Sequence, residues 1–489
     1  MATKLVNGRS EVLLEQLQRI MERPQRHRLL HGYPLAAAMH YLEKSKRKLV
    51  ALVSDMNSRG PSGDSLLVGI LPHPFCNPKI AGCGFCTFPH EFYSAAKSEA
   101  VALAVVQEMK AFARHNPLFV KARPNAIYFG GGTANLTPPA AFLALCETLR
   151  DTFDVTQTEV SLEGVPSRFL QGQRNLIELM RDELPARHFR ISMGIQTFAE
   201  HRLKMMGRTG FGSAETFRHV VDYAHQRGLT TSGDLLFNQP LQNISEMLED
   251  VDRAIDIGLD QICLYHLVLF QGLGTEWSRK PECVANLPSN TEAAENWKIL
   301  RQYLIQNGYI QTSLTNFERQ DIYHSDRRYQ YESISFEDSL CQVVGFGPSG
   351  ISFAQSSDGS NAIKTMNPEH SAEYMQAVQA GDIVCNRYFQ YQTVDVEILD
   401  LTRKMASLSF DRDAFESRFG KGRWESYQEL FALFCAEDLL AQNGTSFRLT
   451  SKGMFYSDSM SSLLAMQRWQ QSPRAQVMST LNDNRAGHM

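Results

Sequence analysis

Between residues 66 and 355 the sequence alternates short apolar runs with amphipathic stretches, and this alternation is the feature that most constrains the fold. Strand-like and helix-like segments in alternation over such a length predict parallel βαβ units. The expected helices cover 95–115, 138–152, 214–227, 245–257 and 291–307. The expected strands cover 66–70, 126–130, 159–163, 189–195, 230–237, 261–270, 310–316 and 343–353.

Six or so units of this kind predict an α/β fold built as a full or partial (β/α) barrel, with a doubly wound open sheet as the alternative. In either fold, functional side chains gather at the carboxyl ends of the strands. The expected parts are a helical extension over 1–60, the barrel over 61–355, a linker over 356–393, a small domain over 394–465 and a polar tail over 466–489.

The small domain over 394–465 predicts helices followed by a strand-like hairpin, which is the pattern of a winged helix. Winged helices often bind DNA, but this range holds 11 acidic against 8 basic residues. The whole chain of 489 residues has a formal net charge of −4. We therefore expect no nucleic acid partner.

Hydropathy and cysteine usage indicate where such a chain works. The sequence has neither an apolar signal core at its start nor a long uncharged apolar stretch, so no membrane segment is expected. Of its nine cysteines, six are scattered, and several of these lie inside apolar elements. Scattered buried thiols are typical of a protein in the reducing cytoplasm.

Three cysteines lie close together directly after the first expected strand. Cys76, Cys83 and Cys86 can hold three corners of a [4Fe-4S] cluster, because soft thiolates suit iron and a short loop can wrap one face of the cluster. The fourth iron is then open to a substrate or cofactor. The alternative is a zinc site completed by His73 or His90, although zinc commonly takes two ligand pairs and the chain has no second pair.

Glycines and polar residues mark the ends of the strands that follow the cysteines. A Gly-Gly-Gly-Thr turn lets a ligand approach the backbone closely, and the later strand ends carry carboxylates, an amide and a nearby arginine. A carboxylate can bind a ribose or an ammonium group, and an arginine can bind a carboxylate. Each residue alone is also explained by a turn, a cap or a salt bridge, but their succession predicts one polar pocket. The residues are Gly131, Gly132, Thr133, Glu163, Gln196, Arg208 and Asp234.

Taken in this order, the motifs resemble the HemN-like group of radical S-adenosylmethionine (SAM) enzymes, whose type member is oxygen-independent coproporphyrinogen III oxidase. The similarity runs from residue 65 to 465 and includes the cysteine loop, with Phe85 before its last cysteine. It continues through Gly-Gly-Gly-Thr, Ser-Leu-Glu, Met-Gly-Ile-Gln-Thr-Phe, Asp-Leu-Leu-Phe-Asn-Gln-Pro, Leu-Tyr-His-Leu, Gly-Phe-Gly-Pro-Ser and Phe-Arg-Leu-Thr-Ser-Lys-Gly.

This resemblance implies a fold, cofactors and partners. The fold would be a partial (β/α)6-type radical SAM barrel carrying a [4Fe-4S] cluster on the three cysteines, with two SAM molecules bound. Reductive cleavage of SAM gives methionine and a 5′-deoxyadenosyl radical, which abstracts hydrogen. The glycines would approach the methionine amino group, Arg208 its carboxylate, and Glu163 and Asp234 the amino group or the ribose. A flavodoxin or ferredoxin would donate the electron, and the substrate would be a small molecule.

The chain also departs from the group's pattern. Its first cysteine gap spans six residues where the group usually has three, and Phe88 stands where the type member has a further cysteine. Residues 329–333 lack the His-Asn and Tyr-Trp motif of the haem-chaperone branch. We therefore expect the branch that methylates or cyclopropanates secondary metabolites with two SAM. The alternatives are an oxidative decarboxylase of porphyrinogens and a non-catalytic haem or cluster carrier.

The substrate and the second SAM are expected at the open end of the barrel, beneath the 394–465 domain. Strand ends carrying Phe237, Tyr265 and His266 would face that space. His266 could remove a proton there as a general base. The competing interpretation is a structural histidine in the barrel wall.

Overall fold

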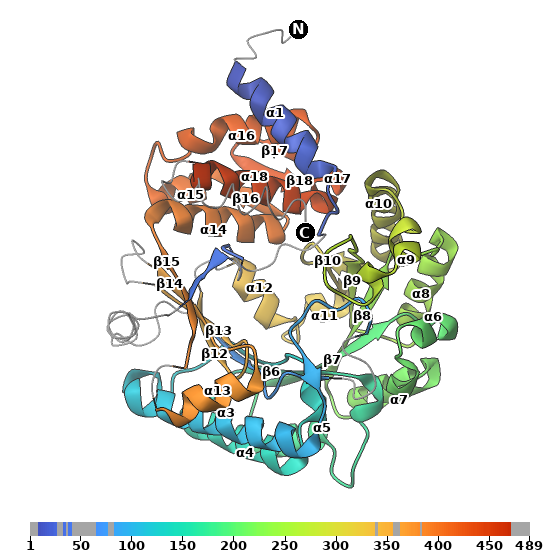
Figure 1. Cartoon of the computed structure of the whole chain (residues 1–489), viewed down its shortest axis with the longest axis vertical. Helices are drawn as coiled ribbons and strands as arrows, with labels where there is room; N and C mark the ends of the chain where they lie inside the picture. Colours follow the sequence, from blue (N-terminus) through green and yellow to red (C-terminus); the bar gives the residue numbers. More distant parts are fainter. Residues whose placement is uncertain are drawn as a thin grey trace.

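The computed structural model describes residues 8–26, 33–35, 38–41, 65–76, 83–337, 341–355, 362–381 and 384–470. Its largest element is a curved sheet of 13 strands (Figure 1). Seven neighbouring strands of this sheet run parallel, in the order β12-β2-β5-β6-β7-β8-β9. They are β2 (Leu66–Ile70), β5 (Ala126–Phe129), β6 (Glu159–Gly164), β7 (His188–Gln196), β8 (Thr230–Phe237), β9 (Gln261–His266) and β12 (Gln342–Phe346).

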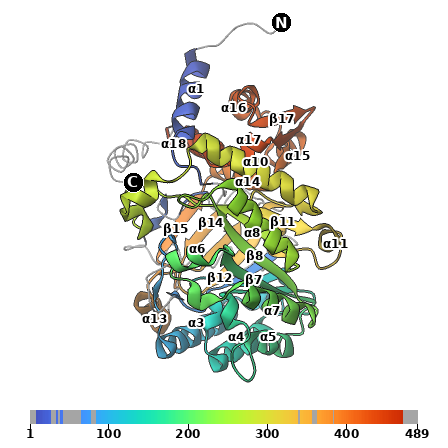
Figure 2. The same cartoon turned by 90° about the vertical axis from the view of Figure 1, so that its right-hand side faces the viewer.

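Helices follow the parallel strands and cover the outer face of the sheet, as Figure 2 shows for the side of α7, α8 and α10. Their apolar stripes pack on alternate strand residues such as Ile191 and Met193, which are fully buried. The helices are α3 (Ala95–His115), α4 (Pro139–Thr152), α5 (Leu176–Glu183), α7 (Ala214–His225), α8 (Ile244–Asp256) and α10 (Asn290–Gln306). The predicted α/β partial barrel is thus confirmed.

Three strand predictions change at the edges of the barrel. The expected strand 310–316 is a hairpin of β10 (Tyr309–Gln311) and β11 (Asn316–Arg319), antiparallel to β9. The expected strand 343–353 is β12 turning back into β13 (Ile351–Gln355), because Gly347 has φ +94°. The strand expected over 261–270 ends at His266.

The prediction of a linker over 356–393 is wrong for its described residues. They form β14 (Ala362–Met366), α13 (Ser371–Gln379) and β15 (Arg387–Tyr391), and the two strands extend the sheet antiparallel beyond β13. Ile363 and Tyr391 are buried in the core there. The polar, turn-rich composition that suggested a linker belongs to residues 356–361, which lie outside the described part of the chain.

The carboxyl-terminal part forms a helical unit with a small antiparallel sheet of order β16-β18-β17, as expected of a winged-helix-like domain. Helix α1 (Gly8–Met21) packs against α16 and α18 of this unit (Figure 1). The remainder of the expected 1–60 extension and of the polar tail lies mostly outside the described residues. The elements are α14 (Thr393–Ala406), β16 (Ser409–Asp411), α15 (Arg412–Phe419), α16 (Glu425–Ala436), β17 (Leu440–Asn443), β18 (Ser446–Leu449), α17 (Ser451–Phe455) and α18 (Ser457–Gln470).

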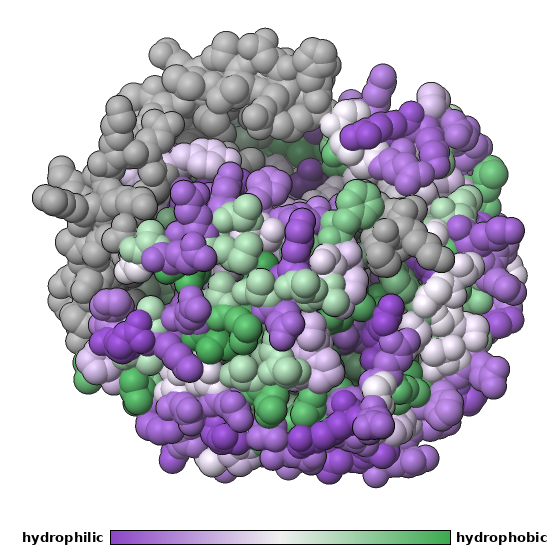
Figure 3. Space-filling view, turned by 60° about the horizontal axis from the view of Figure 1, so that its bottom comes forward, coloured by the Kyte–Doolittle hydropathy of each residue, from purple (hydrophilic) through white to green (hydrophobic). Residues whose placement is uncertain are grey.

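The face at the bottom of Figure 1 is largely hydrophilic at its rim, with hydrophobic side chains scattered between (Figure 3). Exposed apolar residues such as Leu103 on α3 and Leu118 do not gather along one helix, and scattered exposure of this kind is ordinary for a protein surface. Among the described helices, none is long and apolar enough to cross a membrane.

Candidate functional site

The cysteine loop begins where the chain leaves β2. Cys76 ends the short strand β3 (Phe75–Cys76), which pairs with β4 (Glu91–Phe92) on the far side of the loop. The Sγ atom of Cys76 lies 3.1 Å from the hydroxyl oxygen of Thr133. Cys83 is buried, and its Sγ accepts a hydrogen bond of 3.0 Å from the guanidinium of Arg208. The sulfur of Cys86 accepts a longer bond of 3.4 Å from a backbone N–H.

The glycine turn after β5 packs directly against this loop. Gly131 has φ +108°, a conformation that L side chains rarely adopt. A Cβ atom added at Gly132 would lie 2.7 Å from the carbonyl carbon of Pro74 and 2.7 Å from the carbonyl oxygen of Phe75. The glycines therefore allow the turn to contact the backbone that leads into Cys76, and Thr133 reaches the first thiol.

Glu163 stands at the end of β6, beside the glycine turn. Its carboxylate accepts a hydrogen bond of 3.1 Å from the hydroxyl of Tyr128. The pKa of Glu163 is raised to about 7, chiefly by burial and also by the nearby Asp234 on β8, while Tyr128 and Arg190 oppose the shift. Glu163 on β6 and Asp234 on β8 lie on either side of β7, and their carboxylates repel one another. Two such carboxylates suit a cationic ligand.

Gln196 and Arg208 meet above Gly194 at the end of β7. The strand has a register shift between Gly194 and Gln196, and Gln196 takes a positive φ of 72°. A Cβ at Gly194 would lie 3.2 Å from both the Gln196 amide nitrogen and one guanidinium nitrogen of Arg208. Irregular backbone of this kind is commonly found where a strand end re-aims a side chain at a site.

The Arg208 guanidinium is buried and mostly engaged. It donates to Cys83 and to the carbonyl oxygen of Gly194, and it lies 4.8 Å from the ring centroid of Phe211. Its Nε atom is buried and has no hydrogen-bond partner among the described residues. Two of its five N–H groups are used in the bonds to Cys83 and Gly194, so donors of the arginine, Nε among them, remain for a ligand. In this way the structure brings all seven residues of the predicted polar pocket to one end of the sheet, next to the cysteines.

The thiols suit iron as a donor set, Arg208 donates a hydrogen bond to the sulfur of Cys83, and the Thr133 hydroxyl contacts the sulfur of Cys76. The described residues nevertheless contain no group of three His, Cys, Asp or Glu side chains drawn together as metal ligands. Residues 77–82, which separate the first two cysteines, lie outside the described part. His73, one candidate for completing a zinc site, is instead buried, and its Nδ1 accepts the N–H of Phe75 at 3.2 Å.

The interior of the barrel holds a polar layer that sequence reasoning missed. The loop and helix at α12 (Gln330–Glu337) lie between the two edges of the sheet (Figure 1). The Arg190 guanidinium sits 3.9 Å from the ring centroid of Tyr329, and Glu159 accepts the backbone N–H of Gln330 at 2.8 Å. Glu332 accepts hydrogen bonds from Ser313 and Asn316.

Burial raises the pKa of several interior carboxyls above the ordinary glutamate value, with Arg190 acting against the shift in each. The affected residues, each with a pKa of about 7, are Glu159, Glu163, Glu318 and Glu332. The signal for this layer is present in the sequence of β7, where Arg190, Ser192 and Gln196 alternate with apolar residues. A strand buried on both faces with this alternation lines a polar interior.

Of the three residues expected at the substrate site, Phe237 and His266 lie side by side, with ring centroids 5.5 Å apart, while Tyr265 faces the other side of the sheet. Phe237 packs against Trp297 of α10, with ring centroids 6.1 Å apart, on the outer side of the sheet. Tyr265, one residue before His266, packs instead with the apolar cluster that includes Leu236 and Trp277. Alternation along a strand puts successive side chains on opposite faces.

His266 is held as a neutral side chain. Its Nδ1 accepts a hydrogen bond of 3.1 Å from the amide of Asn238, whose own oxygen accepts from Asn296 at 2.8 Å. Burial lowers the pKa of His266 to about 3. The proton of the ring is therefore on Nε2, so His266 offers a hydrogen-bond donor more readily than a base.

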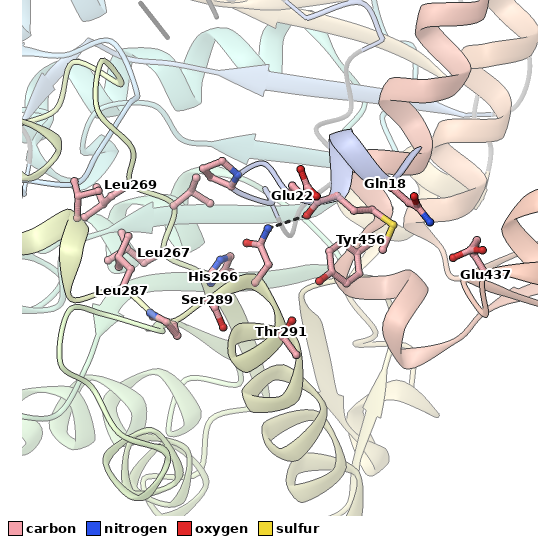
Figure 4. Close-up of a pocket in the computed structure, with 16 residues that line it drawn as sticks. Gln18, Glu22, His266, Leu267, Leu269, Leu287, Ser289, Thr291, Glu437 and Tyr456 are labelled. Carbon is pink, nitrogen blue, oxygen red and sulfur yellow. Dashed lines mark hydrogen bonds between the residues drawn. The ribbon is translucent and has the colours of Figure 1, made fainter. Parts of the chain in front are cut away.

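His266 also lines a pocket of about 810 Å³ between the barrel, α1 and the carboxyl-terminal unit (Figure 4). Leu267 and Leu269 of the pocket wall belong to the same apolar cluster as Trp277. Phe85 of the cysteine loop packs against Trp277, with ring centroids 5.8 Å apart. One layer of apolar side chains thus connects the pocket wall with the cysteine loop.

Comparison with known proteins agrees with this arrangement. Residues 70–254 match the radical SAM superfamily. The chain is 22% identical to the haem chaperone HemW of Lactococcus lactis, over 78% of this chain and 92% of that protein. It is 24% identical to the oxygen-independent coproporphyrinogen III oxidase of Cereibacter sphaeroides, over 68% of this chain and 70% of that protein. The solved structure of coproporphyrinogen III oxidase (HemN) from Escherichia coli matches with a TM-score of 0.69 and 19% identity, over 92% of this chain and 98% of that one.

Proposed function

Because the chain carries a radical SAM domain and is HemN-like in sequence and fold, we propose that it cleaves SAM at a [4Fe-4S] cluster held by Cys76, Cys83 and Cys86. The observation that carries this proposal is the contact of the cysteine loop with the polar strand ends, through Arg208 on Cys83 and Thr133 on Cys76. When bound and reduced, the cluster supplies the electron that cleaves SAM into methionine and a 5′-deoxyadenosyl radical.

The polar residues bind and orient SAM in this proposal. Arg208 directs its free Nε donor at the methionine carboxylate. Glu163 and Asp234 receive the ammonium group or the ribose hydroxyls, which offsets the cost of burying two carboxylates together. Gly131 and Gly132 would approach the amino group through their backbone, in a turn that is held against Leu71 and the backbone of Pro74 and Phe75.

We further propose that the radical reacts with a small-molecule substrate, and that a second SAM donates one carbon to it in a methylation or cyclopropanation. A flavodoxin or ferredoxin would supply the electron. The pocket beneath the carboxyl-terminal unit supports a small-molecule substrate, since its 810 Å³ lies within the usual range of ligand sites, about 300–1,000 Å³. His266 would donate a hydrogen bond there rather than act as the general base.

Two alternatives rest on the relatives. Similarity to oxygen-independent coproporphyrinogen III oxidase supports an oxidative decarboxylase. Similarity to a haem chaperone supports a carrier without catalysis, although residues 329–333 lack the His-Asn and Tyr-Trp motif expected of that branch. In this chain the same residues lie against the polar interior of the barrel.

Product analysis tests the proposal. The reconstituted protein is incubated without oxygen with SAM, dithionite and an extract of candidate substrates, and the products are identified by mass. Two-SAM transfer predicts 5′-deoxyadenosine and S-adenosylhomocysteine together, with one carbon added to the substrate. 5′-Deoxyadenosine with carbon dioxide and without S-adenosylhomocysteine would favour the decarboxylase. Absence of SAM cleavage in a protein that carries its cluster would favour the carrier.

A further inference from the structure

The pocket beneath the carboxyl-terminal unit has two chemically different walls. The barrel side is mostly apolar, with Leu267, Val268, Leu269, Val284, Leu287 and Pro288, and it also carries the polar residues His266, Ser289 and Thr291. The opposite side is more polar and comes from the α1 region and the carboxyl-terminal unit, with Asn290 at the start of α10 bonded to the end of α1 (Figure 4). Its members include Gln18, Glu22, Asn290, Glu437 and Tyr456. A ligand that fills both sides needs one apolar face and one polar face.

The polar wall is held in place by a cross-link between α1 and α10. The Asn290 amide donates to the carbonyl oxygens of Met21 and Arg23, at 2.8 and 2.7 Å. These bonds fix the end of α1, and with it Glu22, at the rim of the pocket (Figure 4). The wall is therefore a defined surface of the fold and not only the side of a free helix.

The charge of the pocket is negative. Glu22 and Glu437 are its charged residues, and neither has an ion-pair partner among the described residues; the described lining includes no lysine or arginine. The amino terminus of α10 does not offset this charge. The Ser289 hydroxyl accepts one N–H of this helix end, that of Glu292, at 3.3 Å. The Glu292 carboxylate, bonded to the backbone N–H of Ser289 at 2.9 Å, adds a negative charge that opposes the positive end of the helix.

From these observations we infer that the pocket binds an amphipathic small molecule that is uncharged or cationic, and that it excludes polycarboxylates. The apolar face of the ligand lies on Leu267 and Leu287, and its polar face meets Glu22 and Glu437. The Lys452 ammonium donates to the backbone carbonyl of Glu437 at 2.7 Å but does not line the pocket. An anionic group at the polar face would therefore meet both carboxylates and no cation of the lining.

As a statement about the substrate, this inference rests on the proposed function. It then argues against a substrate with several carboxylates and for a neutral or basic molecule. The apolar layer of Leu269, Trp277 and Phe85 between the pocket and the cysteine loop is the side from which the chemistry would reach the ligand.

The test uses the full chain and three fluorescent naphthalene dyes that share one ring system and carry a trimethylammonium, a dimethylamino or a sulfonate group. Fluorescence titration should rank the cation and the neutral dye ahead of the sulfonate, by on the order of tenfold or more in Kd between cation and sulfonate. Replacing both carboxylates, as Glu22→Lys with Glu437→Lys, should reverse that order. Leu287→Trp should weaken all three dyes by filling the pocket. Glu373→Lys, an exposed position on α13, is the matched control and should leave the order unchanged.

Equal or tighter binding of the sulfonate by the natural protein would overturn the inference, and so would an unchanged order in the double lysine variant. Dye binding that Leu287→Trp does not alter would place the dyes elsewhere and would also overturn it. SAM cleavage by the natural protein is measured separately. If the natural protein does not cleave SAM, the proposed function is wrong, but the dye ranking still tests the ligand preference of the pocket independently.

Discussion

Replacing Gly132 by alanine tests the contact that joins the glycine turn to the cysteine loop. The added Cβ would lie 2.7 Å from the carbonyl carbon of Pro74, 2.7 Å from the carbonyl oxygen of Phe75 and 2.8 Å from that of Pro74. All three atoms are backbone, so no side chain can turn away. The segment that leads into Cys76 must move instead.

The size of the effect follows from those distances. Carbon atoms pack best at about 3.5 Å or more, so the contact at 2.7 Å is short by roughly 0.8 Å. Forcing an extra methyl group into a packed site costs about 1–3 kcal/mol. For a domain of this size we expect the melting temperature to fall by roughly 2–5 °C. Because the displaced backbone carries Cys76, the iron content after reconstitution should fall as well.

Gly210→Ala is the matched control, because a Cβ there meets nothing within 4 Å and no positive φ is needed. Both variants and the natural protein are compared by thermal unfolding and by iron per chain. The reasoning predicts a lower melting temperature and less iron in Gly132→Ala only. Gly132→Ala with the stability and iron content of Gly210→Ala would refute the proposed packing of the turn on the loop.

Two further predictions concern the SAM-binding residues. Arg208→Ala should weaken SAM binding by roughly tenfold or more, because a charged hydrogen bond contributes about 1.5–3 kcal/mol. Isothermal titration calorimetry measures the affinity, and iron per chain is measured as well because the same guanidinium contacts Cys83. The control is Arg168→Ala, at an exposed position. Since the pKa of Glu163 is raised to about 7, its carboxylate ionises only near neutral pH, so SAM affinity should rise as pH increases through about 7. Without ligand the free energy of unfolding should fall over the range from about 4.5 to 7, because the folded state retains a proton that the unfolded state has lost. Glu163→Gln should flatten the affinity profile. It should remove only its own share of the stability slope, because Glu159, Glu318 and Glu332 also have a pKa of about 7. A variant that keeps the full pH dependence of SAM affinity would contradict the assignment.

The sequence predicted the barrel well because its parallel strands and outer helices differ in hydrophobic period. Strands β2 and β8 begin and end where expected. The linker prediction failed because β14 and β15 are short strands that are buried by pairing, β14 with β13 and β15 with β14. Local composition does not reveal such pairing. The sequence also predicted a single strand in place of each of two hairpins, at Gly347 and at β10–β11. Apolar runs do not reveal where a chain reverses.

The candidate site was predictable at the strand ends and much less so inside the barrel. Glu163, Gln196 and Asp234 follow from the rule that sites gather where parallel strands end. Arg190 follows only from the alternation within β7, and Tyr329 and Glu332 come from a segment after the sheet that returns into its interior. The protonation state of His266 could not be predicted from the sequence. Its neighbours Asn238 and Asn296, which determine its protonation, lie 28 and 30 residues away in sequence and approach it only in the folded chain.

The central claim is that Cys76, Cys83 and Cys86 hold one [4Fe-4S] cluster with an open iron that binds SAM. Electron paramagnetic resonance of the reconstituted, dithionite-reduced protein, recorded with and without SAM, tests it most directly. We predict about four irons per chain, a reduced-cluster signal that changes when SAM is added, and loss of both iron and signal when all three cysteines are replaced by alanine, but not when Cys435 is. A signal that SAM does not change, a triple variant that keeps its iron, or zinc in place of iron would contradict the account.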